Sequence, residues 1–437
     1  MVRNTNYHSW ILKGGIVLEI IMVEKSPPLK GNVRINGAKN SALPILAASL
    51  LGTEDIILED VPRIKDVEIM CEVLESLGAK VDILDDGLIK INSKDLNNHI
   101  TRYDLMNKMR ASLLVMGPLL TRLGKTKSSL PGGCAIGTRP IDLHLKGFKA
   151  LGATVETEHG NIGAYADRLI GDKIYLDFPS VGATENIMMA ATMAQGETII
   201  DNAAMEPEIV DLQNFLNKLG ADIKGAGTST IKIKGVEKLG GASHQIIPDR
   251  IEAGTFMVAA AATGGDVIVD NVISSHIKPV IAKLKEVGVE ILENGDSVRV
   301  NASGRKLNAV DIKTLPYPGF PTDMAAQFMA LLTVCEGSSV VIETVFENRF
   351  MHVDELKRMG ADIKIDGKSA IIRGIDDLTG AQVKASDLRA GAALIIAGLI
   401  SDGVTEIDNI YHIDRGYVDI ESRFKNLGAK IYRKTIE

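Results

Sequence analysis

The chain has 437 residues, a formal net charge of −7 and 45% apolar residues. This length and apolar content allow two buried cores, and the negative charge argues against nucleic acid and anionic membranes as partners. The longest apolar runs, of about 11 residues, are too short to span a bilayer, so membrane insertion is not expected. Three cysteines, with no Cys/His cluster of metal-ligand spacing, favour a reducing, cytoplasmic setting and predict neither a metal nor another cofactor.

The first residues of the chain stand outside the pattern of the rest. Residues 1–16 lack the features of a secretion signal, because Lys13 comes late and Glu19 interrupts the apolar run. They are expected to form a poorly ordered extension. The strand-like segments 18–25 and 32–35 follow, and they have no counterpart before the second repeat. We therefore expect both to pair with the C-terminal half of the chain.

A short phrase, Leu-Gly-Ala or a near copy of it, recurs six times at intervals of about 70 residues, which indicates six copies of one structural unit. Each copy has an apolar stretch rich in small residues, a glycine, a β-branched strand, an amphipathic helix, the phrase and a further strand. The apolar stretch has no polar face, which predicts a buried helix. The glycine of the phrase suits a left-handed helix stop. These glycines are Gly78, Gly152, Gly220, Gly288, Gly360 and Gly428.

The repeats predict an α/β protein of two domains with about three copies in each. A boundary is expected at residues 240–248, between copies three and four. The first domain would span residues 40–247, and the second would combine residues 17–39 with 248–437. The chain would then cross between the domains twice.

One repeated position, at the start of the apolar helix, is basic in four of the six copies. A cation there opposes the helix dipole, so the arrangement costs stability unless an anion lies nearby. A helix start that carries Lys or Arg is a ready anion site, and helix starts of both domains that face each other would line one cleft. Solvated basic residues are the alternative, and the recurrence favours a site. The position holds Lys39, Arg110, Thr184, Arg250, Asp323 and Arg389.

A second repeated position lies where the amphipathic helices begin. We expect Arg349 and Arg415, which occupy it in the last two copies, to point into the same cleft. In the other copies it holds Ile64, next to Arg63, and Glu208 and His276.

Copy two departs most from the repeat. Its glycine-rich loop 131–140 stands where the other copies have a β-branched strand, and it is expected to be exposed and mobile. The loop carries Cys134 near Arg139, and a thiol beside a guanidinium group loses its proton more easily and becomes reactive. An incidental loop cysteine is the alternative. A Cys–His hydrolase with Asp142 and His144 is disfavoured, because both follow on a predicted helix start, and the loop has neither Walker nor dinucleotide-binding spacing.

Six motifs together carry a resemblance to a known family. They resemble the UDP-N-acetylglucosamine 1-carboxyvinyltransferases, enolpyruvyl transferases that open peptidoglycan synthesis, from about Leu18 to Ile436 and in the family's order. The resemblance implies a two-domain enolpyruvyl-transferase fold, in which each domain holds three βαβαββ-type units around buried helices and the active site lies in the cleft between domains. The motifs are residues 37–47, 131–144, 179–185, 320–324, 347–352 and 387–390.

The resemblance also implies roles for single residues. Asp323 would accept the proton of the sugar 3-hydroxyl, and Cys134 would donate a proton and form a covalent adduct with phosphoenolpyruvate. Lys39 and Arg415 complete the implied catalytic set, and with Arg139 they would hold the phosphate and carboxylate of that substrate. The implied substrate-binding residues are Lys39, Asn40, Arg110, Arg139, Pro140, Ile141, Asp142, Leu143, Ser180, Val181, Asp323, Val345, Arg389 and Arg415.

The implied activity is transfer of the enolpyruvyl group of phosphoenolpyruvate to the 3-hydroxyl of UDP-N-acetylglucosamine, with release of phosphate. It would make the protein a cytoplasmic, monomeric enzyme of cell-wall biogenesis, cell shape and division, and a target of fosfomycin through Cys134. Residues 131–143 disfavour the shikimate-pathway transferase, which shares fold and reaction type. Intact Lys39, Cys134, Asp323 and Arg415 disfavour an idle sugar-nucleotide sensor, and the basic helix starts disfavour a scaffold for protein partners.

Overall fold

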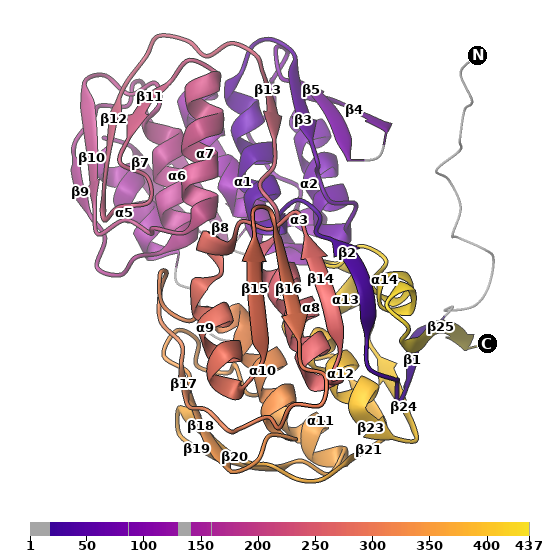
Figure 1. The fold of residues 1–437 in the computed structure, drawn as a ribbon. Coiled ribbons are helices and arrows are strands. Elements are labelled where there is room, and N and C mark those ends of the chain that lie inside the picture. The colour runs from indigo at the N-terminus through magenta and orange to yellow at the C-terminus, as the bar shows by residue number, and fades with distance from the viewer. Residues whose placement is uncertain (1–17, 86, 130–140, 159, 437) are drawn as a thin grey trace, which may run out of the picture.

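A computed structural model of the chain describes residues 18–85, 87–129, 141–158 and 160–436. The chain forms two lobes, each with its own hydrophobic core (Figure 1). One core is built from buried residues between positions 42 and 246. The other combines positions 21–35 with positions 251–431. The predicted extension, residues 1–16, lies outside the described residues.

Among the described residues, six sheets follow one plan, three in each lobe. In the five four-stranded sheets a parallel pair of strands is followed by two antiparallel neighbours. The three-stranded sheet of β6, β8 and β7 is antiparallel, and an isolated bridge between Ile100 and Lys127 stands in place of the parallel strand. A further pair joins β21 (Leu378–Thr379) to β23 (Ser401–Asp402). The orders are β13 (Ala242–Gln245), β3 (Ile56–Glu59), β5 (Leu88–Asn92), β4 (Lys80–Asp85); β6 (Lys125–Ser129), β8 (Asn161–Tyr165), β7 (Thr154–Glu158); β9 (Lys173–Tyr175), β10 (Glu197–Asp201), β12 (Thr230–Lys234), β11 (Asp222–Lys224); β2 (Lys30–Arg34), β14 (Asp266–Asp270), β16 (Ser297–Asn301), β15 (Glu290–Asn294); β17 (Ile312–Lys313), β18 (Ser338–Ile342), β20 (Ser369–Arg373), β19 (Asp362–Asp366); and β22 (Gln382–Lys384), β24 (Val404–Asp408), β1 (Leu18–Glu24), β25 (Lys430–Ile436).

Strands from distant parts of the chain complete three of these sheets. β1 pairs with β24 and β25, and β2 pairs with β14, so both N-terminal strands lie in the C-terminal lobe (Figure 1). β13 comes after copy three and pairs with β3 of copy one. In the N-terminal lobe the closing strand comes from the end of the lobe's own continuous sequence. In the C-terminal lobe β1 and β2 come from the start of the chain, which must pass between the lobes to supply them.

A buried helix packs inside each copy, as the absence of a polar face predicts. Their side chains are almost all buried, in α8 from Ile251 to Ala261. Short 3-10 turns extend several of them: η1 (Ser49–Leu51), η2 (Arg110–Val115) and η4 (Thr322–Met324). The buried helices are α1 (Lys39–Ala48), α4 (Met116–Leu123), α6 (Val181–Ala191), α8 (Arg250–Ala262), α10 (Ala325–Leu332) and α12 (Leu388–Ile400).

The second helix of each copy ends at the glycine of the repeated phrase. All six glycines have φ between 89° and 109°, the left-handed conformation that the phrase predicts. Shorter helices complete the fold: α3 (Tyr103–Lys108), η3 (Ser274–His276) and α13 (Tyr411–Asp414). The second helices are α2 (Lys65–Ser76), α5 (Asp142–Ala150), α7 (Pro207–Lys218), α9 (Lys278–Val287), α11 (Val353–Arg358) and α14 (Ile420–Asn426).

Copy two keeps the strand that the glycine-rich loop was expected to replace. β6 pairs with β8 along its full length, so this expectation was wrong. Its residues are mostly polar, but Thr126, Ser128 and Ser129 are buried, and pairing with a neighbouring strand satisfies the backbone without a β-branched sequence. The loop 131–140 itself lies outside the described residues.

The two passages of the chain between the lobes run side by side. Gly37 forms an antiparallel bridge with Pro248, the Ala38 N–H donates to the Ile247 carbonyl at 2.7 Å, and the Asp249 N–H donates to the Asn36 carbonyl at 2.9 Å. A side chain at position 37 would place its Cβ 1.9 Å from the Asp60 carbonyl oxygen. The pairing brings the first turns of α1 and α8 next to each other, although they belong to different lobes.

Within the described residues, none of the helices has the length and apolar character needed to cross a membrane.

Close packing of the buried helices gives a stability test. A Cβ at Gly117 of α4 would lie 2.5 Å from both the backbone and the side-chain oxygen of Asn186 in α6. We expect Gly117→Ala to lower the free energy of unfolding by ~1–3 kcal/mol through overpacking. Gly163→Ala in β8 is the control, because the nearest atom lies 3.9 Å away. Urea unfolding midpoints measure the effect, and equal midpoints for the two variants would contradict this packing.

Candidate functional site

The repeated position at the helix starts falls where the sequence places it. Lys39 and Arg250 are the first residues of α1 and α8, and Arg389 is the second residue of α12. Asp323 lies in η4, directly before α10, and Thr184 lies in the first turn of α6. Arg110 opens η2, but its side chain is outside the described part of the structure.

Lys39, Asp66 and Arg415 form one charged group across the two lobes. The Lys39 Nζ lies 2.7 Å from Asp66 Oδ2, and the side chains are 12% and 2% exposed. The Arg415 Nε donates to Asp66 Oδ1 at 2.8 Å. Burial lowers the pKa of Lys39 and Asp66 opposes this change, while Lys39 and Arg415 outweigh burial and lower the pKa of Asp66. The carboxylate is therefore ionised between two cations.

Asp323, Arg349 and Arg389 form a second group. Asp323 Oδ1 accepts from Arg349 at 2.8 Å and Oδ2 accepts from Arg389 at 3.0 Å, so one carboxylate joins two nearly buried guanidinium groups. Burial opposes the charge of Arg389, but Asp323 more than offsets it and the pKa of Arg389 is raised. The Arg389 charge also lowers the pKa of Lys39. The two groups are thus close enough to act on each other electrostatically.

Buried polar side chains hold the second group in place. The Arg389 guanidinium donates to the Tyr417 hydroxyl at 3.3 Å, and that hydroxyl lies 2.9 Å from Thr255 Oγ1. His352 is 1% exposed beside Arg349, and burial lowers its pKa to about 4. At neutral pH His352 is uncharged, so the positive charge here comes from the arginines.

Arg250 has a counter-ion from the opposite lobe. Its Nε donates to Glu208 Oε1 of α7 at 3.0 Å, and the two side chains are 11% and 4% exposed. Burial opposes the Arg250 charge, but Glu208 leads the effects that raise the pKa of Arg250. Glu185 in α6 is 3% exposed, and burial, together with Glu208 and Glu206, raises its pKa well above its ordinary value. Glu208 thus ties the lobes together at a second place.

The sequence predicted that anions near the basic helix starts offset their unfavourable position on the helix dipole. In the structure the protein's own carboxylates are these anions. Lys39, Arg250 and Arg389 each oppose a helix dipole, and each has a partner: Asp66, Glu208 and Asp323 respectively. The basic helix starts do not need a bound anion for stability in this structure. The helix starts place these cations at one junction between the lobes. An anionic ligand there would either displace the carboxylates from the cations or bind to the cations beside them.

The residues expected at the uridine diphosphate lie on two packed helices. Asp142 and Leu143 open α5 and Ile141 precedes it, while Ser180 caps α6 by accepting from the Ala183 N–H at 3.4 Å. Val181 is the first residue of α6. The Asn186 side chain lies 3.1 Å from His144 Nδ1, which joins the two helices. No sequence motif predicts this contact, because it depends on how the two helices cross.

Asn40 and Val345, the two other residues expected to bind substrate, both lie in the described part of the structure. Asn40 is the second residue of α1, next to Lys39. The Val345 N–H donates to Glu343 Oε1 at 2.7 Å, and Glu343 Oε2 accepts from Thr322 at 2.8 Å. Glu343 thereby holds the Val345 backbone and the turn that carries Asp323 together. Cys134, Arg139 and Pro140 lie outside the described residues.

Sequence reasoning named Asp323 and Glu208 but missed three other carboxylates of the site. Asp66 was not singled out, and it is 1% exposed. Asp249 caps α8 by accepting from Ile251 and Glu252, and it also accepts from the Lys39 N–H at 3.2 Å. Asp387 caps α12 in the same way. An Asp one or two residues before a basic helix start is a capping signal that could have found the last two.

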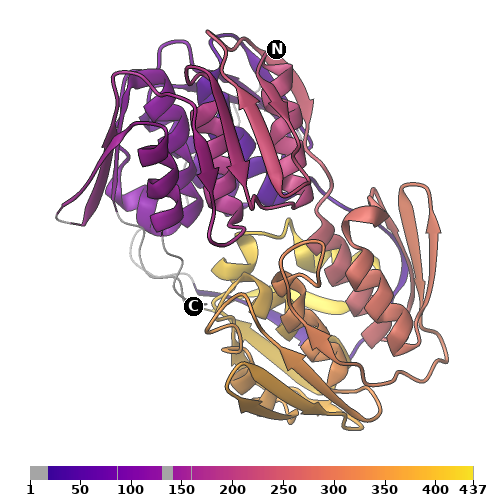
Figure 2. The ribbon, with the colours of Figure 1, turned by 90° about the vertical axis from the view of Figure 1, so that its left-hand side faces the viewer.

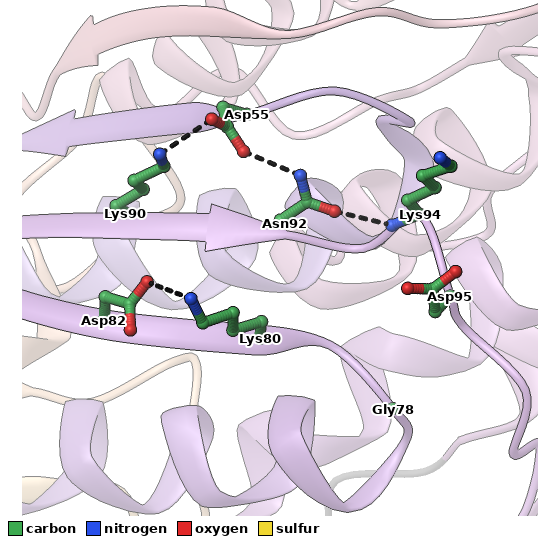
Figure 3. Close-up of a pocket in the computed structure, with 8 residues that line it drawn as sticks. All are labelled: Asp55, Gly78, Lys80, Asp82, Lys90, Asn92, Lys94 and Asp95. Atoms are coloured by element: carbon green, nitrogen blue, oxygen red, sulfur yellow. Dashed lines mark hydrogen bonds and ion pairs between the residues drawn. The ribbon is translucent and has the colours of Figure 1, made fainter.

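A separate surface pocket lies on the outer face of the sheet formed by β3, β5 and β4 (Figure 3). Its ion pairs, Lys90 with Asp55 and Lys80 with Asp82, are largely exposed, and such pairs contribute little stability. None of the predicted site residues lines it. Among the described residues there is also no cluster of His, Cys, Asp or Glu that could hold a metal ion.

Comparison with known proteins places the chain in a family. The profile of the family described as EPSP synthase (3-phosphoshikimate 1-carboxyvinyltransferase) matches residues 23–424. A protein of Finegoldia magna named UDP-N-acetylglucosamine 1-carboxyvinyltransferase is 68% identical over 96% of this chain and 100% of its own length. One from Caldanaerobacter subterraneus subsp. tengcongensis, named UDP-N-acetylglucosamine 1-carboxyvinyltransferase 1, is 65% identical over 94% of this chain and 99% of its own length.

Solved structures agree on the fold. The enolpyruvyl transferase NikO from Streptomyces tendae superimposes with a TM-score of 0.87 at 24% identity, over 97% of this chain and 100% of its own. EPSP synthase from Acinetobacter baumannii gives a TM-score of 0.74 at 19% identity, over 95% of this chain and 100% of its own. The predicted two-domain enolpyruvyl-transferase fold is confirmed. The chain belongs to the enolpyruvyl transferases and, within them, to the family of UDP-N-acetylglucosamine 1-carboxyvinyltransferases.

Proposed function

We propose that this protein transfers the enolpyruvyl group of phosphoenolpyruvate to the 3-hydroxyl of UDP-N-acetylglucosamine and releases phosphate. The observation that carries the proposal is the junction of buried and half-buried cations, in which Lys39, Arg389 and Arg415 come from both lobes and the two arginines lower the pKa of Lys39. A small, strongly anionic substrate suits such a site. The names of the 65–68% identical relatives supply the acceptor, UDP-N-acetylglucosamine, and the carboxyvinyl group that is transferred.

Phosphoenolpyruvate would bind at the Lys39–Asp66–Arg415 group. An ammonium group has three N–H donors, and Asp66 takes one from Lys39. The phosphate and carboxylate of the substrate would engage Lys39, Arg415 and Arg389, and Arg139 would join them from the loop. Cations fixed in advance around a departing phosphate stabilise the charge that develops on it, because they need no reorganisation during the reaction.

The chemistry divides between an acid and a base. Protonation of C3 by Cys134 makes C2 of phosphoenolpyruvate electrophilic, and the sugar 3-hydroxyl oxygen bonds to C2 as its proton passes to Asp323. Return of a proton from C3 to the Cys134 thiolate then re-forms the double bond as the bond from C2 to the phosphate oxygen breaks. The products are the enolpyruvyl ether and inorganic phosphate, so atoms and charges balance without a cofactor. A reactive Cys134 would also accept alkylation by fosfomycin.

The two lobes would act as the domains of this enzyme, with residues 40–247 in one and residues 17–39 with 248–437 in the other. The uridine diphosphate would lie along the first turns of α5 and α6, with Ile141 to Leu143, Ser180 and Val181, together with Arg110 and Pro140. Asn40 and Val345 would face the sugar. Closure of the domains on the nucleotide would exclude water and bring the loop 131–140 to Asp323. We place the enzyme in the cytoplasm as a monomer.

The substrate pair is tested by phosphate release from phosphoenolpyruvate. We expect release with UDP-N-acetylglucosamine and none without it, because the hydroxyl of the nucleotide sugar is the acceptor. Release with shikimate 3-phosphate instead would move the activity to the reaction named in the family profile. If neither acceptor gives phosphate release, the proposal is contradicted and an idle sugar-nucleotide sensor is favoured.

The role of Asp323 is tested by Asp323→Asn, which keeps the shape of the side chain but cannot take a proton. We expect kcat to fall by roughly 10²–10⁴-fold, the range for loss of a general base. The affinity for UDP-N-acetylglucosamine, measured by calorimetry, should change little. Asp362→Asn, at an exposed position of β19, is the charge-matched control. Equal kcat values for both variants would exclude Asp323 as the base.

A further inference from the structure

One buried carboxylate remains without a role in the proposed reaction. Asp66 is 1% exposed, and both of its oxygens are occupied: Oδ2 by Lys39 at 2.7 Å and by Arg415 at 3.2 Å, and Oδ1 by Arg415 at 2.8 Å. Both partners are residues that would bind phosphoenolpyruvate. Burying three charges costs several kcal/mol in desolvation, so the arrangement is not accounted for by stability alone.

The elements that carry the three residues explain how Asp66 joins the other two. Asp66 is the second residue of α2, where a negative charge interacts favourably with the helix dipole. Lys39 begins α1, whose buried residues share a core with those of α2, and it directly follows the passage of the chain between the lobes. Arg415 follows α13 in the other lobe. The bidentate contact from Arg415 therefore fixes one lobe against the other at the place where Lys39 enters its helix.

The charges around Lys39 show how Asp66 affects the pKa of its ammonium group. Burial lowers the pKa of Lys39, and the cations Arg415 and Arg389 lower it further. Asp66 raises the pKa of Lys39 through its charge and through the hydrogen bond that it accepts. The other charged or titratable groups near Lys39 are engaged elsewhere. Asp249 accepts from the backbone N–H of Lys39, and Asp211 of α7 accepts from Ser41, two residues further along the chain.

The groups around the two arginines are also accounted for. Asp323 is paired with Arg349 and Arg389, and burial lowers the pKa of His412 beside Arg415. Without Asp66, the nearly buried Lys39 ammonium would lose this ion pair while the cations Arg415 and Arg389 remain close to it.

We propose that Asp66 is the positioning residue of the phosphoenolpyruvate site: it keeps Lys39 protonated and holds Lys39 and Arg415 together across the two lobes. The inference rests on the proposed function, because it assigns Asp66 to that same site. Asp66 does not touch the reacting atoms in this account. It acts through the two cations, and the anionic substrate arrives at a site whose charge and geometry are already set.

The test is Asp66→Asn, compared with Glu68→Gln, which removes one charge from the same helix at a largely exposed position. In Asp66→Asn the Lys39 ammonium loses its counter-ion and gives up its proton more easily. As the pH is raised, activity should therefore be lost at a lower pH than in the native protein. We expect the alkaline limb of kcat/KM for phosphoenolpyruvate to move down by on the order of one pH unit. At neutral pH, kcat/KM should fall roughly 10²-fold through lost positioning. Glu68→Gln should stay within about twofold and keep the limb.

A merely structural role would lower the unfolding midpoint and leave the limb unmoved, and that result would overturn the inference. Asp66→Glu provides a second variant if Asp66→Asn does not fold. It keeps the charge but displaces the cations, so the limb should stay while kcat/KM for phosphoenolpyruvate falls and the affinity for UDP-N-acetylglucosamine is retained. Unchanged kcat/KM in Asp66→Glu would contradict the positioning role.

Failure of the proposed function can be told apart from failure of this inference. If the native protein releases no phosphate with UDP-N-acetylglucosamine, the function is wrong, but the Lys39 titration still decides the role of Asp66. NMR titration of labelled lysines, with Lys39 assigned by Lys39→Arg, should give a lower pKa in Asp66→Asn than in the native protein. An equal pKa would reject the inference whatever the reaction.

Discussion

Asp249 joins the first turns of two buried helices that belong to different lobes. One of its oxygens accepts from the N–H groups that begin α8, and the other accepts from the N–H of Lys39, the first residue of α1. The antiparallel contact between Gly37 and Pro248 places the two passages of the chain so that this is possible. Because the candidate site residues occupy helix starts, their positions depend on this junction. The sheets and hydrophobic cores of the two lobes hold these helices in place.

The chain order explains why the junction exists. A protein made of six tandem copies would have one connection between its third and fourth units. Here β1 and β2 precede copy one but lie in sheets of the C-terminal lobe, so the chain passes between the lobes twice (Figure 2). Two adjacent passages limit how the lobes can move relative to each other. The pairs Arg415–Asp66 and Arg250–Glu208 add charged contacts between the lobes.

The sequence was sufficient for the repeat, the buried helices and the stops at six glycines, because periodicity and glycine chemistry are local signals. It also located Lys39, Arg250 and Arg389 at helix starts. It could not identify Asp66 or Glu208 as their partners, since a carboxylate on an amphipathic helix looks exposed until the neighbouring lobe covers it. It was wrong about β6, whose polar residues form a strand only because β8 pairs with them. Long-range packing, which no local pattern records, decides these points.

A crystal structure with phosphoenolpyruvate and UDP-N-acetylglucosamine bound tests the central claim most directly. The account predicts the phosphate within hydrogen-bonding distance of Lys39 Nζ and the Arg415 guanidinium, with Asp323 facing the sugar 3-hydroxyl. Phosphoenolpyruvate bound away from the junction, with Lys39 and Arg415 still held only by Asp66, would contradict it.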